Sequence, residues 1–125
     1  MIAGIGTDIA AVARLGKLYE RHGERVLEKL LAPIERADFS KAGNPARFLA
    51  KRFAAKEALG KALGIGVTPP ATMPNIAIIH DALGRPLFDY APPLGAYLAE
   101  QNLRAHLSIS DEAEYALAFV VLEKD

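Results

Sequence analysis

The chain has 125 residues, of which 51% are hydrophobic and none is cysteine. This size and composition favour one folded domain spanning residues 1–125, and they exclude a disulfide scaffold and thiolate chemistry. Fifteen basic and fifteen acidic residues cancel, which argues against a general nucleic-acid-binding protein, because such proteins usually carry a basic excess. The first residues show no basic leader and no long apolar run, so we expect a cytoplasmic protein that does not bind membranes.

The first half of the chain shows a strand and then helical periodicity. Residues 2–9 alternate between two kinds of side chain, which is typical of a strand. One face carries Ile5, Thr7 and Ile9, and the other carries Gly4, Gly6 and Asp8. The helical segments that follow are residues 11–31 with a weak point at Gly23, residues 33–39 with Pro33 in the first turn, and residues 46–63 between a loop at 41–45 and the glycine-rich turn "GIG" at 64–66.

The second half of the chain predicts strands in pairs. A proline-rich connection, residues 67–75, leads to two short strands at 76–80 and 87–90 that flank a turn. The last elements are a helix at 94–103 and a C-terminal hairpin formed by residues 104–110 and 115–122 around "DEAE". The resulting order, β-α-α-β-β-α-β-β, favours an α+β fold in which helices pack on a mostly antiparallel sheet.

The predicted helix 46–63 is apolar on two nearly opposite sides. At about 100° per residue, Leu59 falls on one side and Phe53 on the other. We therefore expect this helix to be covered by two neighbouring elements, or by one element and a second subunit. Glu57 lies at the edge of the Phe53 side, one turn before Lys61. These two charges form either a plain i, i+4 ion pair, which contributes roughly 0.2–0.5 kcal/mol, or part of a functional site.

Asp8 follows Gly4 and Gly6 on the same face of the first strand. Glycine inside a strand often marks the close approach of a ligand or of another backbone, although an aspartate here could equally cap the next helix. If Asp8 and Glu57 converge, they suit Mg²⁺, which takes one or two protein carboxylates and completes its shell with water and phosphate oxygens. No cluster of histidine and cysteine competes for a zinc site.

Basic side chains are concentrated in two helical segments. The central helix carries Arg47, Lys51, Arg52, Lys56 and Lys61. Next to a metal and a glycine turn they favour bound phosphate, but a solvated helix surface has the same composition. The earlier helix carries Arg14, Lys17, Arg21, Arg25 and Lys29, with Glu20, Glu24 and Glu28 beside them. That stripe is either a salt-bridged surface or a docking site for an acidic partner helix.

Four motifs together resemble those of the holo-acyl-carrier-protein synthases, the short bacterial type of phosphopantetheinyl transferase. "GIGTD" at 4–8 is similar to the N-terminal motif of the family, and "RFAAKEALGKALGIG" at 52–66 matches its long central motif without a break. "HLSIS" at 106–110 is similar to the strand motif near the C-terminus, and "GRP" at 84–86 to the turn that precedes it. The resemblance covers essentially the whole chain. The chain departs from many relatives at Asp111, where they have histidine, and at Leu83, where they have polar residues.

The resemblance implies transfer of phosphopantetheine from coenzyme A to a serine hydroxyl of an acyl carrier protein, in support of fatty acid biosynthesis. It implies that Asp8 and Glu57 hold Mg²⁺ and that Lys61 contacts the reacting phosphate. It also implies a homotrimer with active sites between protomers, in which a neighbouring subunit supplies His106. The implied coenzyme A contacts are Arg52, Lys56, Lys61, Gly64, His106 and Ser108. The implied carrier-docking residues are Arg14, Arg21, Arg25 and Lys29.

The implied reaction makes Glu57 and Lys61 the candidate catalytic residues. Attack on the β-phosphate of coenzyme A builds negative charge, which Mg²⁺ and Lys61 would neutralise. The serine proton would go to Glu57 or to a metal-bound water that Glu57 orients, and the sequence does not choose between them. Two other functions stay open: a non-catalytic binding module, and a Mg²⁺-dependent hydrolase of nucleotide diphosphates that needs no carrier protein.

Overall fold

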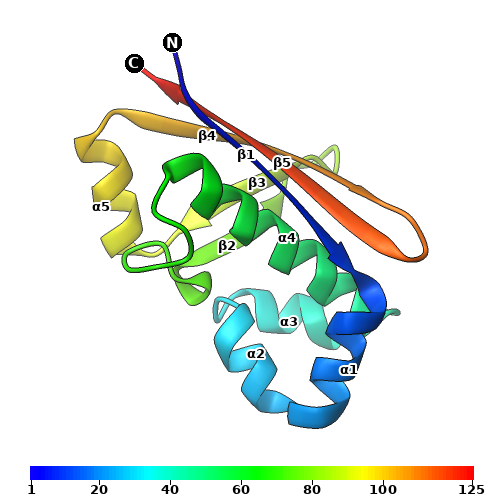
Figure 1. The fold of residues 1–125 in the computed structure, drawn as a ribbon. Coiled ribbons are helices and arrows are strands. Elements are labelled where there is room, and N and C mark those ends of the chain that lie inside the picture. Colours follow the sequence, from blue (N-terminus) through cyan, green and yellow to red (C-terminus); the bar gives the residue numbers. More distant parts are fainter.

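One long helix lies at the centre of the computed structural model, which describes residues 1–125 (Figure 1). The helices are α1 (Val12–His22), α2 (Glu24–Leu30), α3 (Glu35–Ser40), α4 (Pro45–Leu63) and α5 (Pro92–Glu100), with a short 3-10 turn, η1, at Met73–Asn75. The strands are β1 (Ile2–Ala11), β2 (Ile76–His80), β3 (Pro86–Tyr90), β4 (Leu103–Asp111) and β5 (Tyr115–Lys124). No helix combines the length and the apolar character that a membrane crossing requires.

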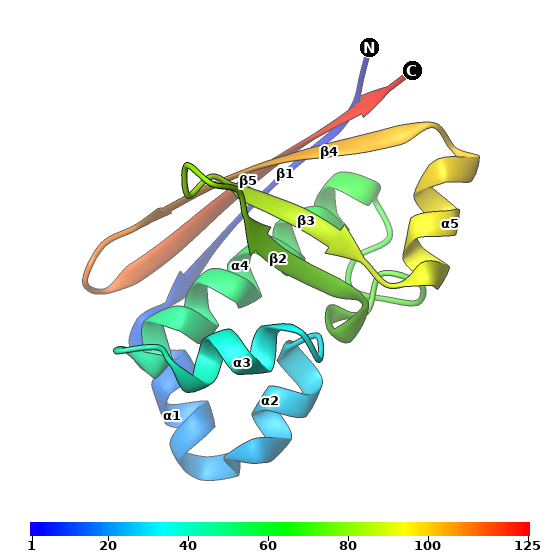
Figure 2. The same ribbon diagram turned by 180° about the vertical axis from the view of Figure 1, so that it is seen from behind.

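All strand pairs are antiparallel, and the predicted α+β class is confirmed. The larger sheet has the order β1-β5-β4, so the first and last strands of the chain are neighbours. β2 and β3 form a separate pair, seen on the other side of α4 when the molecule is viewed from behind (Figure 2). Side chains alternate along β1 as predicted, because Gly6 and Ala10 are buried against α4 while Ile5 and Ile9 are exposed.

The helix predicted over residues 11–31 is two helices, α1 and α2. Gly23 separates them with a φ of +54°, a conformation that glycine adopts far more easily than other residues. The short helix α3 begins at Glu35 rather than at the predicted Pro33. Helix α5 begins at Pro92, earlier than predicted, because proline is tolerated in the first turn of a helix. The basic residues that were expected to follow one helical side are therefore divided between α1 and α2.

Helix α4 has well-defined ends and is covered within the chain. The side chain of Asn44 accepts a hydrogen bond from the backbone N–H of Arg47 at 3.1 Å, which caps the first turn. Gly64, with a φ of +78°, ends the last turn. The inner face of the sheet packs on one side of α4, while α1 and β2 pack on others (Figures 1 and 2). Both apolar sides are thus covered by elements of the same chain, and a second subunit is not needed to explain them.

Candidate active site

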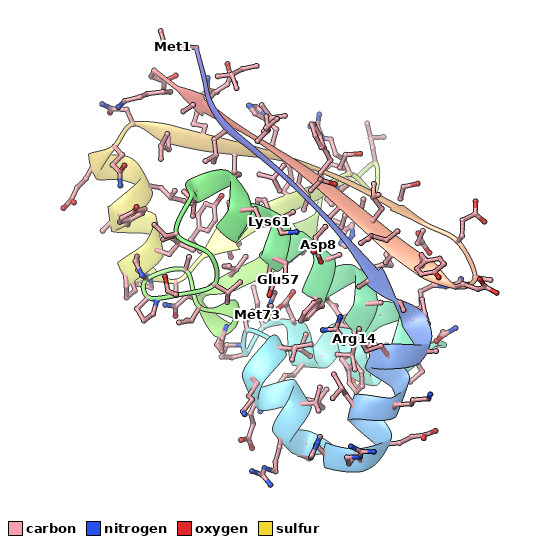
Figure 3. All side chains as sticks on the ribbon, in the orientation of Figure 1. Met1, Asp8, Arg14, Glu57, Lys61 and Met73 are labelled. Carbon is pink, nitrogen blue, oxygen red and sulfur yellow. The ribbon has the colours of Figure 1, made fainter.

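Asp8 lies on the face of β1 that is turned toward α4, beside the two glycines. A Cβ atom on Gly6 would lie 2.0 Å from the carbonyl oxygen of Ala58, and Gly4 is packed against α4 in the same way. Only glycine leaves room for the backbone of α4 at these positions. The close approach brings Asp8 to the part of α4 that carries Glu57 (Figure 3).

Lys61 of α4 contacts Asp8 directly. Its Nζ donates hydrogen bonds to Oδ1 of Asp8 and to the carbonyl oxygen of Thr7, both at 3.0 Å. No ion pair joins Lys61 to Glu57, so the plain i, i+4 alternative is wrong. Asp8 does not cap α1 either, because the residue before that helix is Ala11 and no side chain caps it. The carbonyl of Thr7 was not predicted as part of the site, since a backbone atom has no residue type that marks it.

The two carboxylates lie close enough for their charges to interact, and one of their oxygens is unpaired. Oδ2 of Asp8 is buried and has no hydrogen-bond partner. The pKa of Glu57 is raised, first by burial and then by the charge of Asp8, while the charges of Lys61 and Arg14 oppose this shift. No group of three or more histidine, cysteine, aspartate or glutamate side chains gathers anywhere in the chain. Two carboxylates with an orphaned oxygen fit Mg²⁺, which takes its remaining ligands from water and phosphate.

The turn after α4 lies next to Lys61, and Lys61 itself borders a hollow. The backbone N–H of Gly64 donates to the carbonyl oxygen of Gly60 at 3.1 Å. A hollow of about 370 Å³ opens beside Lys61, between α4 and the outer face of the sheet, and its lining includes Thr7 and Phe119. This space is large enough for part of a substrate, and the role of Gly64 in binding coenzyme A stays a prediction.

Arg52 and Lys56, both predicted to contact coenzyme A, are buried in the core instead. Nζ of Lys56 lies 2.6 Å from Oε1 of Glu35, and Nε of Arg52 lies 3.0 Å from Oε2 of the same carboxylate. Burial lowers the pKa of Lys56 to about 8, although the charge of Glu35 opposes this shift. We correct the prediction for both residues, because their charged groups face an internal carboxylate and not a space that a nucleotide could enter.

The relationship to known proteins follows from the sequence and from the fold. Residues 4–120 match the family model of the 4'-phosphopantetheinyl transferase superfamily. The chain belongs to that superfamily. The holo-[acyl-carrier-protein] synthase of Dechloromonas aromatica is 67% identical over 123 residues, which make up 98% of this chain and 98% of the relative. The resemblance found in the sequence motifs is thereby confirmed.

Solved structures of the same type share the fold of this transferase. The crystal structure of holo-[acyl-carrier-protein] synthase from Neisseria meningitidis has a TM-score of 0.96 at 49% identity and covers 99% of this chain and 100% of its own. The Bacillus anthracis holo-(acyl-carrier-protein) synthase, in complex with CoA (3',5'-ADP), has a TM-score of 0.84 at 33% identity. The match covers 100% of this chain and 99% of the Bacillus chain.

His106 and Ser108 of the transferase lie on the outer face of the sheet. Both are exposed on β4, and β5 separates them from β1. Nε2 of His106 lies 2.6 Å from Oε1 of Glu123, a partner that the sequence did not indicate. Because Asp8 points to the inner face, one chain does not bring His106 to the two carboxylates. Its role at the site of a neighbouring subunit stays a prediction.

The basic side chains of α1 and α2 are exposed, and they line two hollows. Arg14, Lys17, Leu18 and Arg21 line the first, of about 360 Å³. The second, of about 280 Å³, is lined by Leu18, His22, Arg25, Val26, Lys29 and Leu30. None of these basic residues forms an ion pair with Glu20, Glu24 or Glu28, which argues against the salt-bridged alternative. Arg14 also lies near the site, with its Cζ 5.1 Å from the ring centre of Phe53.

The two residues that depart from the family pattern lie in different places. Asp111, at the end of β4, lies 3.6 Å from Nε of Arg47 and 4.0 Å from Nζ of Lys51. It thus balances part of the positive charge at the start of α4. Leu83 lies in the turn between β2 and β3 and is 95% exposed.

Proposed function

We propose that the chain is a Mg²⁺-dependent holo-[acyl-carrier-protein] synthase. It transfers phosphopantetheine from coenzyme A to a serine hydroxyl of an apo acyl carrier protein, releases adenosine 3',5'-bisphosphate, and serves fatty acid biosynthesis in the cytoplasm. The observation that carries this proposal is the partly buried pair of carboxylates next to Lys61, in which one oxygen of Asp8 is buried without a hydrogen-bond partner. The names of the relatives and the coenzyme bound in a related structure support the same reaction.

Asp8 and Glu57 are the residues that would hold the metal. When bound, Mg²⁺ would neutralise the pyrophosphate and the charge that develops on it during transfer. The free Oδ2 of Asp8 supplies a ligand oxygen that has no other partner. Glu57 has no ion-pair partner, so its carboxylate is also available.

Lys61 is placed to stabilise the negative charge of the transferred group. An ammonium has three donors, and Lys61 uses two of them on Asp8 and Thr7. About half of its side chain is exposed toward the hollow beside β1. The remaining donor can therefore reach a phosphate oxygen without breaking either hydrogen bond.

Glu57 is the proposed acceptor of the serine proton, directly or through a water that it orients. The serine oxygen attacks the β-phosphorus of coenzyme A, and the bond from this phosphorus to the bridging oxygen breaks. The bridging oxygen leaves on adenosine 3',5'-bisphosphate, and the serine proton passes to Glu57. In the metal-free chain, burial and the charge of Asp8 raise the pKa of this carboxyl.

The outer face of the sheet is the proposed subunit interface of a homotrimer. It exposes Ile5 by 62%, Phe119 by 42% and Leu117 by 40%, next to Ile9 and Tyr115. A contiguous apolar surface of this kind marks an interaction site. His106 lies at the border of this surface, on β4, so assembly through it would place His106 next to another protomer, where it would contact coenzyme A.

The exposed basic residues Arg14, Arg21, Arg25 and Lys29 are the proposed docking surface for the carrier protein. They surround hollows that contain the apolar side chain of Leu18. An acidic helix with apolar side chains would complement this surface in charge and in shape.

Incubation with coenzyme A, Mg²⁺ and an apo carrier protein tests the proposed function. We expect the carrier to gain the mass of one phosphopantetheine, as measured by mass spectrometry, and adenosine 3',5'-bisphosphate to form in equal amount. Release of the nucleotide without a carrier protein would indicate the hydrolase instead. Binding of the carrier without any mass gain would indicate the non-catalytic module.

A further inference from the structure

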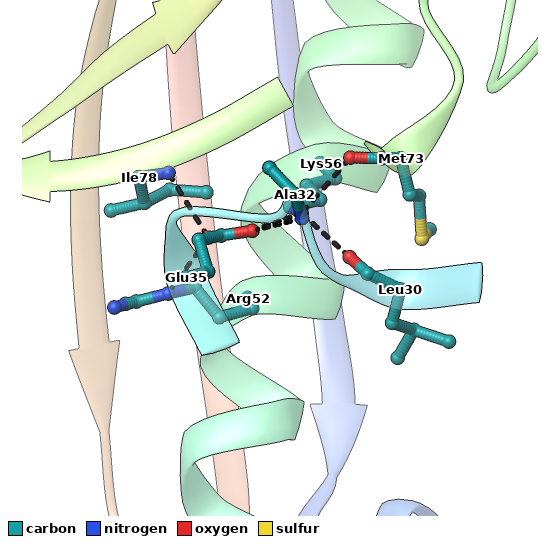
Figure 4. Close-up of polar contacts among 7 residues, drawn as sticks. All are labelled: Leu30, Ala32, Glu35, Arg52, Lys56, Met73 and Ile78. Carbon is teal, nitrogen blue, oxygen red and sulfur yellow. Dashed lines mark hydrogen bonds and ion pairs between the residues drawn. The ribbon is translucent and has the colours of Figure 1, made fainter. Parts of the chain in front are cut away.

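A buried cluster of three charges lies between α3 and α4. It consists of Glu35, Arg52 and Lys56, and the side chains of Glu35 and Lys56 are 0% exposed (Figure 4). Nζ of Lys56 donates to Oε1 of Glu35 at 2.6 Å, to the carbonyl oxygen of Leu30 at 2.6 Å and to that of Met73 at 3.0 Å. All three donors of the ammonium are used.

The carboxylate of Glu35 is equally saturated. Oε1 also accepts from the backbone N–H of Ala32 at 2.8 Å, and Oε2 accepts from that of Ile78 at 3.1 Å and lies 3.0 Å from Nε of Arg52. These contacts connect five segments, which are the end of α2, α3, α4, η1 and β2 (Figure 4). The cluster therefore links α4 to the other four segments.

The stability of the fold does not by itself require these charges. Desolvation offsets much of the attraction in a buried ion pair, and apolar residues of similar volume often stabilise a core equally well. An apolar contact, however, tolerates small rotations of a helix, whereas three directed hydrogen bonds from one ammonium do not. The property that the cluster adds is a defined orientation of α4.

The other restrained side of α4 faces β1. Cβ atoms on Gly6 and Gly4 would lie 2.0 and 2.2 Å from the carbonyl oxygens of Ala58 and Ala62. At about 3.6 residues per turn, Glu57 and Lys61 lie between this face and the face of Arg52 and Lys56. The directions in which Glu57 and Lys61 point therefore depend on both the contact of α4 with β1 and its contact with the charge cluster.

We propose that Glu35 and Lys56 are positioning residues, which hold α4 in the rotation that directs Glu57 and Lys61 at Asp8. The proposal rests on the proposed function, because it assigns a task to the same carboxylates. Neither residue touches coenzyme A or the metal. Their effect is exerted through the orientation of α4.

Lys56→Met tests the proposal, since methionine keeps the length of the apolar part of the lysine side chain and removes the ammonium. We expect kcat to fall between about 10- and 100-fold, the loss that follows a misplacement of about 1 Å. The KM values for coenzyme A and for the carrier should stay within about twofold. The affinity for Mn²⁺, measured on the free protein by electron paramagnetic resonance, should fall as well, because Glu57 would no longer be held beside Asp8.

Leu98→Ala is the matched control for lost stability. Leu98 is buried in α5, away from both carboxylates, and its truncation lowers the unfolding temperature without touching the cluster. Both variants are assayed at a temperature at which each is fully folded. If Lys56→Met loses no more kcat and no more Mn²⁺ affinity than Leu98→Ala, the proposal is overturned. A selective rise in the KM for coenzyme A would also overturn it, because that result indicates direct contact.

Glu35→Gln provides a second route if Lys56→Met does not fold. It keeps the shape and one acceptor oxygen of the side chain. We therefore expect both kcat and the Mn²⁺ affinity to fall, but by less than in Lys56→Met. Failure of the proposed function looks different from failure of this inference. In the first case the wild-type chain itself neither modifies a carrier nor binds Mn²⁺, and in the second the wild type does both while the cluster variants behave like Leu98→Ala.

Discussion

At the scale of single residues, Asp8 and Glu57 differ in how their charges are balanced. Asp8 has Lys61 at 3.0 Å on one oxygen and no partner on the other. Burial and the charge of Asp8 raise the pKa of Glu57, and only the more distant charges of Lys61 and Arg14 oppose this shift. Asp8 therefore has an ion-pair partner within the chain, whereas Glu57 has none.

We expect Asp8→Ala and Glu57→Ala each to lower transfer by more than about 100-fold, because even residues that only orient a metal ligand often change activity by 10–100-fold. The measurement is phosphopantetheine transfer at saturating Mg²⁺. Glu100→Ala, which removes an exposed carboxylate at the end of α5, should leave transfer unchanged. Near-normal turnover in either active-site variant would contradict a shared metal site.

The pKa of Glu57 predicts how metal binding depends on pH. The carboxyl must lose its proton to bind Mg²⁺, and its pKa is raised by burial and by Asp8. As the pH falls, Mg²⁺ affinity should therefore begin to decrease at a higher pH than for an ordinary glutamate. Carbon NMR of the labelled Glu57 carboxyl should show a high titration midpoint that Asp8→Asn lowers. An unchanged midpoint in Asp8→Asn would mean that the two carboxylates do not interact.

The sequence allowed some residue roles to be predicted and not others. Alternation along β1 and helical spacing indicated which faces carry Asp8, Glu57 and Lys61, and the family resemblance assigned their chemistry. Arg52 and Lys56 were misplaced because their partner, Glu35, lies in a different helix and no local pattern links them. A lysine in an apolar helix has the same appearance in sequence whether its charge faces a ligand or an internal carboxylate.

At the scale of elements, the distance between β1 and α4 depends on Gly6. An added Cβ would lie 2.0 Å from the oxygen of Ala58 and 2.7 Å from the backbone nitrogen of Ala62, so the strand must move away from the helix. We expect Gly6→Ala to reduce stability by about 1–3 kcal/mol and transfer by more than about tenfold, since misplacement of Asp8 follows. Denaturant unfolding and the carrier assay measure the two effects.

Gly43→Ala is the control for this substitution. Gly43 lies in the loop before α4, and no atom lies within 4 Å of an added Cβ. Its replacement should change stability by less than about 0.5 kcal/mol and leave transfer intact. Equal behaviour of the two variants would show that the contact between β1 and α4 adapts to a methyl group without consequence.

The exposed basic residues of α1 and α2 are expected to affect the kinetics of carrier binding. Reversal of Arg21 and Arg25 to Glu should raise the KM for an acidic carrier by roughly tenfold at low salt, because long-range attraction mainly speeds encounter. The KM for coenzyme A should not change. Added salt should reduce the difference, since exposed charges are screened over about 8 Å at physiological ionic strength.

A double reversal of Arg36 and Lys41 is the matched control for net charge. Both are exposed and lie in or directly after α3, outside the basic surface of α1 and α2. If this control raises the KM for the carrier as much as the reversal of Arg21 and Arg25, overall charge and not a docking surface governs the encounter.

Element boundaries were predictable where a residue enforces them and not elsewhere. The end of α4 at Gly64 was expected from the glycine-rich turn, whereas its start was predicted at residue 46 and lies at Pro45, after the cap at Asn44. The break at Gly23 was expected only as a weak point, because helix periodicity continues across it and a positive φ leaves no trace in the pattern of side chains. The pairing of β1 with β5 was not predicted, since alternation indicates which face is buried but not which strand is the neighbour.

At the scale of the whole molecule, the outer face of the sheet predicts assembly. Phe119 is 42% exposed at the centre of an apolar surface formed by β1 and β5. Phe119→Asp should convert the proposed trimer into monomers by light scattering and lower transfer, because His106 would lose its place beside the next protomer. Leu83→Asp changes a still more exposed leucine in a turn outside this surface and should leave the assembly intact. A fully active monomeric wild type would contradict the trimer.

The pairing of β1 with β5 affects how this fold can form. The strand that carries Asp8 has one partner in the sheet, β5, which is the strand furthest from it along the sequence, with Thr7 opposite Phe119. The backbone N–H of Lys124 even bonds to the carbonyl oxygen of Met1 at 2.7 Å. Until β5 has been made, β1 is an unpaired and apolar edge of the kind that aggregates during folding. The chain can form α4 earlier, but the sheet that holds Asp8 against α4 is complete only when β5 is in place.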